Sequence, residues 1–151
     1  MKLKRTNSAD KDFVALVVDL DKYLAEVDGD EHDYYAQFNG IEAIKNVVVA
    51  YEADRPVGCG AFKPYSDDAV EIKRMFVSPE FRGRKIGAEI LSALEKWASE
   101  LGYRECILET GQKQKAAVRL YQISGYEVIP NYDQYAGIEN SVCMKKSVAS
   151  A

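Results

Sequence analysis

The spacing of apolar residues divides the chain into segments with a helical period and segments with a strand period. Residues 2–6 alternate and predict a short strand, and the polar run 7–10 then offers several helix N-cap residues. Apolar residues next recur every three or four positions, which predicts a helix to about Val27 with one buried face, ended by Gly29. That face carries Phe13, Leu16, Val17, Leu20 and Leu24.

The segment 30–38 is acidic and rich in aromatic residues, and it predicts a second, short helix before Gly40. β-Branched and aromatic runs follow, separated by turn residues, and predict an antiparallel meander. The three strands cover 47–53, 57–63 and 70–78. The remaining pattern predicts helices over 85–101 and 112–124 and strands over 106–109, 126–129 and 142–145. This order predicts an α+β layered sheet of about seven strands.

Composition narrows the class of protein. A chain of 151 residues with 47% apolar content fits a single domain over 1–151. Its apolar runs are far shorter than the roughly 20 residues that span a bilayer, and no signal peptide is visible, so we expect a cytoplasmic protein without a membrane partner. The net charge of −4 disfavours nucleic acid and mildly favours a cationic partner.

Three cysteines, Cys59, Cys106 and Cys143, are widely scattered and form no pair with metal-site or redox spacing. We expect reduced thiols in the core and no metal site. None lies beside a histidine or a predicted helix N-terminus, the settings that lower a thiol pKa, so a cysteine nucleophile is not expected.

The segment 79–88 is the strongest candidate for binding a ligand. A strand ends at Pro79, a turn carries the cations Arg82, Arg84 and Lys85, and an amphipathic helix begins at once. Free backbone N–H groups and the helix dipole favour an anion at such a helix start, where cations alone are unfavourable. This predicts a phosphate site. The alternative is a turn whose basic side chains are simply solvated.

Two motifs of the chain resemble the GNAT superfamily, the Gcn5-related N-acetyltransferases. Arg82-Gly-Arg-Lys-Ile-Gly87 resembles its Arg/Gln-x-x-Gly-x-Gly/Ala pyrophosphate loop, with Lys85 where the pattern has its first glycine. Lys85 is then expected to avoid a backbone conformation reserved for glycine. Gln114-x-x-Ala117-x-x-x-Tyr121-x-x-x-Gly125-Tyr126 resembles the second signature, with Gln114 in place of Asn.

The resemblance implies a mixed, mostly antiparallel twisted sheet with helices on both faces, and an N-acetyltransferase that uses acetyl-CoA. It further implies that backbone groups of the strand before the loop bind the pantetheine and thioester, and that the loop binds the diphosphate. The implied cofactor-binding residues are Met75, Phe76, Val77, Arg82, Gly83, Arg84, Lys85, Ile86, Gly87, Ala88, Gln114 and Tyr121.

Two residues are candidates for proton transfer. The resemblance implies that Tyr121 protonates the leaving thiolate, which suits a phenol with a pKa near 10; the alternative is a buried aromatic of the helix. An amine attacks only as the free base, and Glu71 is the candidate base. The alternative is that Glu71 is only an outward-facing residue of an alternating strand. His32 or a water relay would then serve as the base.

The expected substrate is a primary amine of a small molecule, acetylated by direct transfer in a ternary complex. Carboxylates and tyrosine faces suit a cationic amine, and the candidate substrate-binding residues are Tyr34, Tyr35, Glu71, Tyr132 and Tyr135. A protein or peptide amine remains an alternative, as does a non-catalytic acyl-CoA-binding regulatory module. Strand edges near the C-terminus would also allow a homodimer.

Overall fold

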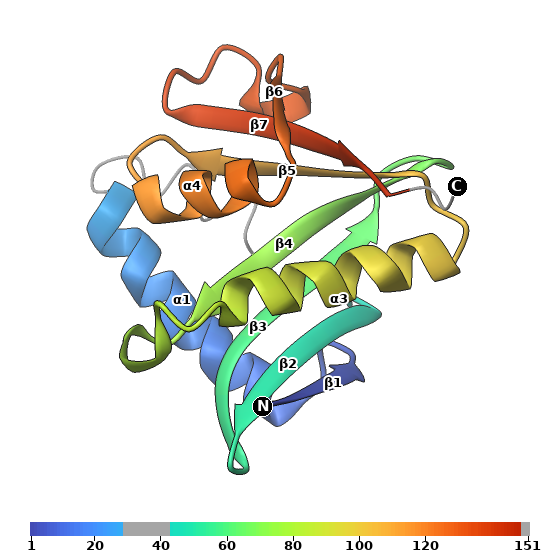
Figure 1. Ribbon diagram of the computed structural model, residues 1–151. Coiled ribbons are helices and arrows are strands. Elements are labelled where there is room, and N and C mark those ends of the chain that lie inside the picture. The colour runs from blue at the N-terminus through green and yellow to red at the C-terminus, as the bar shows by residue number, and fades with distance from the viewer. Residues whose placement is uncertain (29–42, 149–151) are drawn as a thin grey trace.

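The computed structural model describes residues 1–28 and 43–148, which contain one seven-stranded sheet (Figure 1). The strand order is β1-β2-β3-β4-β5-β7-β6, and every neighbouring pair is antiparallel except β4 and β5. The bounds are β1 (Lys2–Thr6), β2 (Asn46–Glu52), β3 (Arg55–Pro64), β4 (Ala69–Val77), β5 (Glu105–Gly111), β6 (Glu127–Ile129) and β7 (Ser141–Ser147). The mixed, mostly antiparallel α+β sheet predicted from the sequence is confirmed.

Helices cover both faces of this sheet (Figure 1). Helix α1 (Lys11–Asp28) packs on one face, and α3 (Ile86–Glu100) and α4 (Lys115–Ile123) pack on the other. Two short 3-10 turns, η2 (Pro79–Phe81) and η3 (Asp133–Tyr135), complete the described elements. The helix predicted over 30–38 lies outside the described residues.

Helix α1 forms as its sequence predicts. Asp10 Oδ1 caps its first turn by accepting hydrogen bonds from the N–H groups of Asp12 (2.9 Å) and Phe13 (3.1 Å). Four of the five apolar positions named for its inner face are buried, and Leu24 is half-buried.

The helix predicted from Gln112 begins three residues later than expected. Strand β5 stays paired with β7 as far as Gly111 opposite Ser141, and the Gln112 N–H then donates to the Asn140 carbonyl. These inter-strand bonds hold the chain extended, so α4 starts only at Lys115. The start of α4 is therefore set by pairing with a distant strand, which no local sequence pattern indicates.

The sheet opens between its two parallel strands. Strands β4 and β5 pair only from Ala69–Glu71 to Glu105–Ile107, although both continue beyond these residues. Past this point they diverge (Figure 1), so the later part of β4 has no ladder partner on its β5 side.

A bulge in β4 lies at this opening. Arg74 has a φ of 61°, and the register with β3 shifts between Cys59 and Ala61. Gly60, opposite the bulge, has no room for a side chain, since a Cβ there would lie 2.5 Å from Met75 Sδ. The bulge therefore depends on a glycine in the neighbouring strand.

The three cysteines are buried and reduced, as expected from their spacing. Burial raises the pKa of the Cys59 and Cys106 thiols to about 12 and that of Cys143 to about 11. Across residues 1–28 and 43–148, no helix combines the length and apolar character needed to cross a membrane.

Candidate active site

Two adjoining cavities occupy the opening between β4 and β5. The larger cavity has a volume of about 370 Å³ and the smaller cavity about 90 Å³. They share four lining residues, Leu20, Met75, Gln114 and Tyr121, and so form one cleft with two parts.

The larger cavity is bounded by the end of β4, the turn before α3 and one side of α4. It brings together the expected cofactor-binding residues Met75, Phe76, Val77, Arg82, Gly83, Lys85, Ile86, Gly87, Ala88, Gln114 and Tyr121. Arg84 is the exception: it does not line the cavity, and its guanidinium lies 5.1 Å from the centroid of the Phe81 ring. Arg82 donates from Nε to the Val77 carbonyl (3.0 Å) and stacks over Tyr23.

The start of α3 faces this cavity. No side chain caps the helix, and its first intrahelical bond runs from the Glu89 N–H to the Lys85 carbonyl. The N–H groups of residues 86–88 precede that bond and have no partner within the helix. The turn thus has the backbone geometry that favours an anion.

The backbone conformation of Lys85 contradicts the expectation from the sequence. It was expected to avoid a conformation reserved for glycine, but it has φ 64° and ψ 15°, in the left-handed region. The turn needs this conformation to enter α3, and Lys85 occupies the position where the related motif has glycine. The backbone geometry of the motif is therefore kept without the residue that adopts it most easily.

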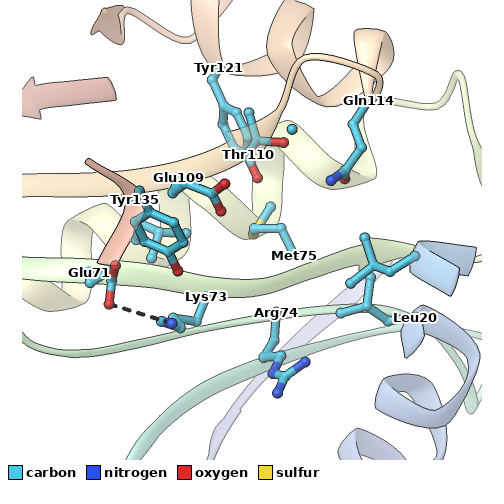
Figure 2. A pocket seen from close by; sticks show the side chains of 13 residues that line it. Leu20, Glu71, Lys73, Arg74, Met75, Glu109, Thr110, Gln114, Tyr121 and Tyr135 are labelled. Carbon is cyan, nitrogen blue, oxygen red and sulfur yellow. Dashed lines mark ion pairs between the residues drawn. The ribbon is translucent and has the colours of Figure 1, made fainter. Parts of the chain in front are cut away.

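The smaller cavity is lined by charged and aromatic side chains from β4, β5 and η3 (Figure 2). Glu71 is 4% exposed, and its carboxylate accepts a 2.7 Å hydrogen bond from the Tyr132 hydroxyl. Lys73 Nζ lies 3.6 Å from Glu71 Oε1, and burial lowers the pKa of Lys73. Tyr135 lines the cavity, with its ring edge-on to Tyr132 at 5.7 Å.

Tyr121 lies where the two cavities meet. Its ring is buried edge-on against Tyr126 at 5.9 Å, and in Figure 2 its side chain extends from α4 toward Glu109 and Met75. Burial, and secondarily the charge of Glu109, raise the pKa of the Tyr121 hydroxyl above its usual value. Tyr121 therefore packs in the core and also reaches the cleft, so the two interpretations of this residue are compatible.

Three charged residues of the smaller cavity were not anticipated as site residues: Lys73, Arg74 and Glu109. An acidic residue ending an otherwise apolar strand was the available signal for Glu109. Nothing in the alternation of β4 distinguishes Arg74, because a bulge is what directs its side chain. Tyr34, Tyr35 and His32 lie outside the described residues.

Comparison with known proteins identifies the family. Residues 13–126 match the Acetyltransferase (GNAT) family. A protein of Azospirillum brasilense named IAA acetyltransferase is 30% identical over 141 residues, covering 88% of each chain. A Klebsiella pneumoniae structure described as an acyl-CoA N-acyltransferase has a TM-score of 0.80 at 26% identity, covering 97% of each chain. A Salmonella typhimurium structure with acetyl-CoA shares the fold, with a TM-score of 0.70 at 17% identity over 100% of this chain and 95% of that one.

A sheet opened between two parallel strands, with a helix N-terminus facing the opening, defines an α+β protein with a cleft that favours an anionic ligand. The chain belongs to the acetyltransferase (GNAT) family. Membership confirms that it is an N-acetyltransferase and that its cofactor is acetyl-CoA.

Proposed function

We propose that the protein acetylates a primary amine of a small molecule by direct transfer from acetyl-CoA in a ternary complex. The observation that carries this proposal is the position of Tyr121, which lines both parts of the cleft. A donor in the larger cavity and an acceptor in the smaller cavity would meet beside its hydroxyl.

The larger cavity suits the pantetheine and diphosphate parts of the cofactor. Its volume of about 370 Å³ lies within the usual range for ligand pockets, roughly 300–1,000 Å³. The diphosphate would bind the N–H groups at the start of α3, assisted by Arg82. The pantetheine would lie along Met75–Val77, whose backbone groups have no β5 partner.

The chemistry needs one proton acceptor and one proton donor. The amine nitrogen, as the free base, attacks the thioester carbonyl carbon and forms the C–N bond. As the C–S bond breaks, the Tyr121 hydroxyl gives its proton to the departing sulfur. The proton lost by the nitrogen passes to a carboxylate and from there, through solvent, restores the Tyr121 hydroxyl. The products are the amide and free CoA.

Glu71 and Glu109 are the two carboxylates that can accept this proton. The Glu71 carboxylate already receives a hydrogen bond from Tyr132 and has Lys73 nearby. Glu109 acts on the pKa of Tyr121 and lies toward it in Figure 2. We assign Glu71 as the base, as expected from the sequence, and Glu109 as the alternative that the geometry adds.

A small acceptor is favoured over a peptide. The smaller cavity, at about 90 Å³, admits an amine with a few atoms around it, and its carboxylates and Tyr135 suit an ammonium group. A cytoplasmic location and a homodimer remain predictions from the sequence.

The test is release of free CoA from acetyl-CoA across a panel of small amines and N-terminal peptides, with wild type, Tyr121→Phe, Glu71→Gln and Glu109→Gln. We expect turnover with small amines that falls about 100-fold or more in Tyr121→Phe, the usual range for loss of a general acid. The stronger effect of the two glutamine variants on kcat identifies the base. Turnover with peptides alone would overturn the small-molecule proposal, and unchanged turnover in Tyr121→Phe would overturn its catalytic role.

A further inference from the structure

Arg74 is a buried cation that lines the smaller cavity. Its side chain is 3% exposed, and one guanidinium nitrogen, Nη1, lies 3.3 Å from Asp21 Oδ1 of α1. The other, Nη2, is buried without a hydrogen-bond partner among the described residues. Leaving a charged donor buried and unsatisfied is unfavourable, so this nitrogen requires an explanation.

The backbone conformation of Arg74 is also energetically unfavourable. Its φ of 61° is unusual for a residue with a side chain, and it belongs to the bulge that Gly60 permits. Backbone strain of this kind persists where the surrounding structure enforces it, and such positions cluster at ligand sites. The strand therefore bears two unfavourable features at one residue that lines the smaller cavity.

Charge is divided within the smaller cavity. In Figure 2 the carboxylates of Glu71 and Glu109 lie on the Tyr135 side, whereas Arg74 extends toward α1 and Leu20. The Lys73 ammonium lies 3.6 Å from Glu71 Oε1 and so belongs to the carboxylate side. A cavity for a simple amine would need only the carboxylates. The Arg74 guanidinium at its α1 side suits an anion carried by the same ligand.

We propose that Arg74 binds a carboxylate of the acceptor, so that the acceptor is an amino acid whose amine faces the glutamates. A guanidinium binds a carboxylate through paired N–H groups, and Nη2 supplies a donor that the protein leaves unused. The small volume of the cavity fits an amine and a carboxylate separated by one or two carbons. This inference rests on the proposed function, because it assigns the acceptor of the same site.

The test compares each common amino acid with its own carboxamide, which keeps the amine and side chain but lacks the negative charge. We expect kcat/KM to be about ten- to a hundredfold higher for the acid, the range for a hydrogen bond to a charged group. In Arg74→Met this preference disappears, mainly through a higher KM for the acids. Equal kcat/KM for acid and carboxamide in wild type would overturn the inference and leave amine acetylation intact.

Arg74→Met is expected to fold, since methionine fills a similar path and Asp21, with its side chain 50% exposed, can be solvated without its partner. Arg104→Met is the matched control, because Arg104 is exposed and lines neither cavity. Arg74→Lys keeps the positive charge but lacks the paired N–H donors of a guanidinium. It should therefore show only part of the wild-type preference for acids over carboxamides.

A binding measurement separates this inference from the proposed function. N-acetyl amino acids and their carboxamides are titrated by calorimetry into wild type and Arg74→Met in the presence of CoA. Binding of the carboxylates alone, lost in Arg74→Met and kept in Arg104→Met, supports the anion site even if no acceptor is turned over. Equal binding of both probe sets, or binding of neither, overturns it.

Discussion

The Tyr132 hydroxyl donates a 2.7 Å hydrogen bond to the Glu71 carboxylate, joining the segment before η3 to strand β4 across 61 positions of sequence. Both residues were expected at the substrate site for separate reasons, and the fold makes them partners. Because Glu71 is buried, this bond fixes the orientation of its carboxylate.

Tyr132→Phe should therefore disturb both stability and catalysis. A buried carboxylate that loses a donor costs about 1–3 kcal/mol of unfolding free energy, and kcat/KM should fall because Glu71 is no longer oriented. Urea denaturation and CoA-release kinetics measure the two effects. Tyr51→Phe is the control: it removes a 2.6 Å bond to Asp12, which lines neither cavity, whereas Glu71 lines the smaller one. Equal activity in the two variants would contradict a role for Tyr132 at the site.

The pH dependence of kcat reports on Tyr121. Because burial raises the pKa of Tyr121, its hydroxyl stays protonated through neutral and mildly alkaline pH, and ionisation of this acid should not lower kcat below about pH 10. The raised pKa of Tyr121 also contributes to the free energy of unfolding. This contribution is fully present below the pKa of the hydroxyl in the unfolded chain, and it is lost as pH rises through the pKa in the folded protein. A decline in kcat near pH 8 that disappears in Tyr121→Phe would be inconsistent with this assignment. Tyr126→Phe serves as the control; it removes a hydroxyl that donates a hydrogen bond to Glu95.

Gly60→Ala should destabilise the β4 bulge. The added Cβ would lie 2.5 Å from Met75 Sδ and 2.9 Å from side-chain atoms of Ile90 and Leu94, and overpacking of this kind costs about 1–3 kcal/mol. Since Met75 lines both cavities, acetyl-CoA affinity should also fall, as calorimetry would detect. Gly102→Ala is strained through its φ of 94° but lies in open space outside the cleft. It should lose stability with unchanged affinity; the same affinity loss in both variants would rule out a local effect.

Lys85→Gly should stabilise the protein. The left-handed conformation costs a residue with a side chain about 1–2 kcal/mol, and glycine offsets part of this gain by about 0.5–1 kcal/mol through its flexible unfolded state. The expected net gain is up to about 1.5 kcal/mol, read from thermal unfolding. Lys85→Ala keeps the strain and should show no gain. An equal rise in acetyl-CoA KM in both variants would identify the Lys85 ammonium, rather than the backbone, as the phosphate-binding group.

Local patterns were sufficient for most of the elements. The inner face of α1 follows from apolar spacing around Phe13 and Leu20, and the Asp10 cap is a contact within one turn. The expectation of an anion at 82–88 also follows from local features, a glycine-containing turn and a helix start. Such features depend on neighbours a few residues away, which the order of amino acids specifies directly.

Which residues line the cleft depends on contacts between segments far apart in the sequence. Glu109 becomes a site residue because β5 diverges from β4 after Ile107, and Arg74 because a bulge opposite Gly60 redirects its side chain. By itself the sequence determined the order of the described elements, the turn and helix start that favour an anion, and the family-like position of Tyr121. Only the tertiary structure decided which charges share the smaller cavity, because strand register and divergence are set by pairing across the whole sheet.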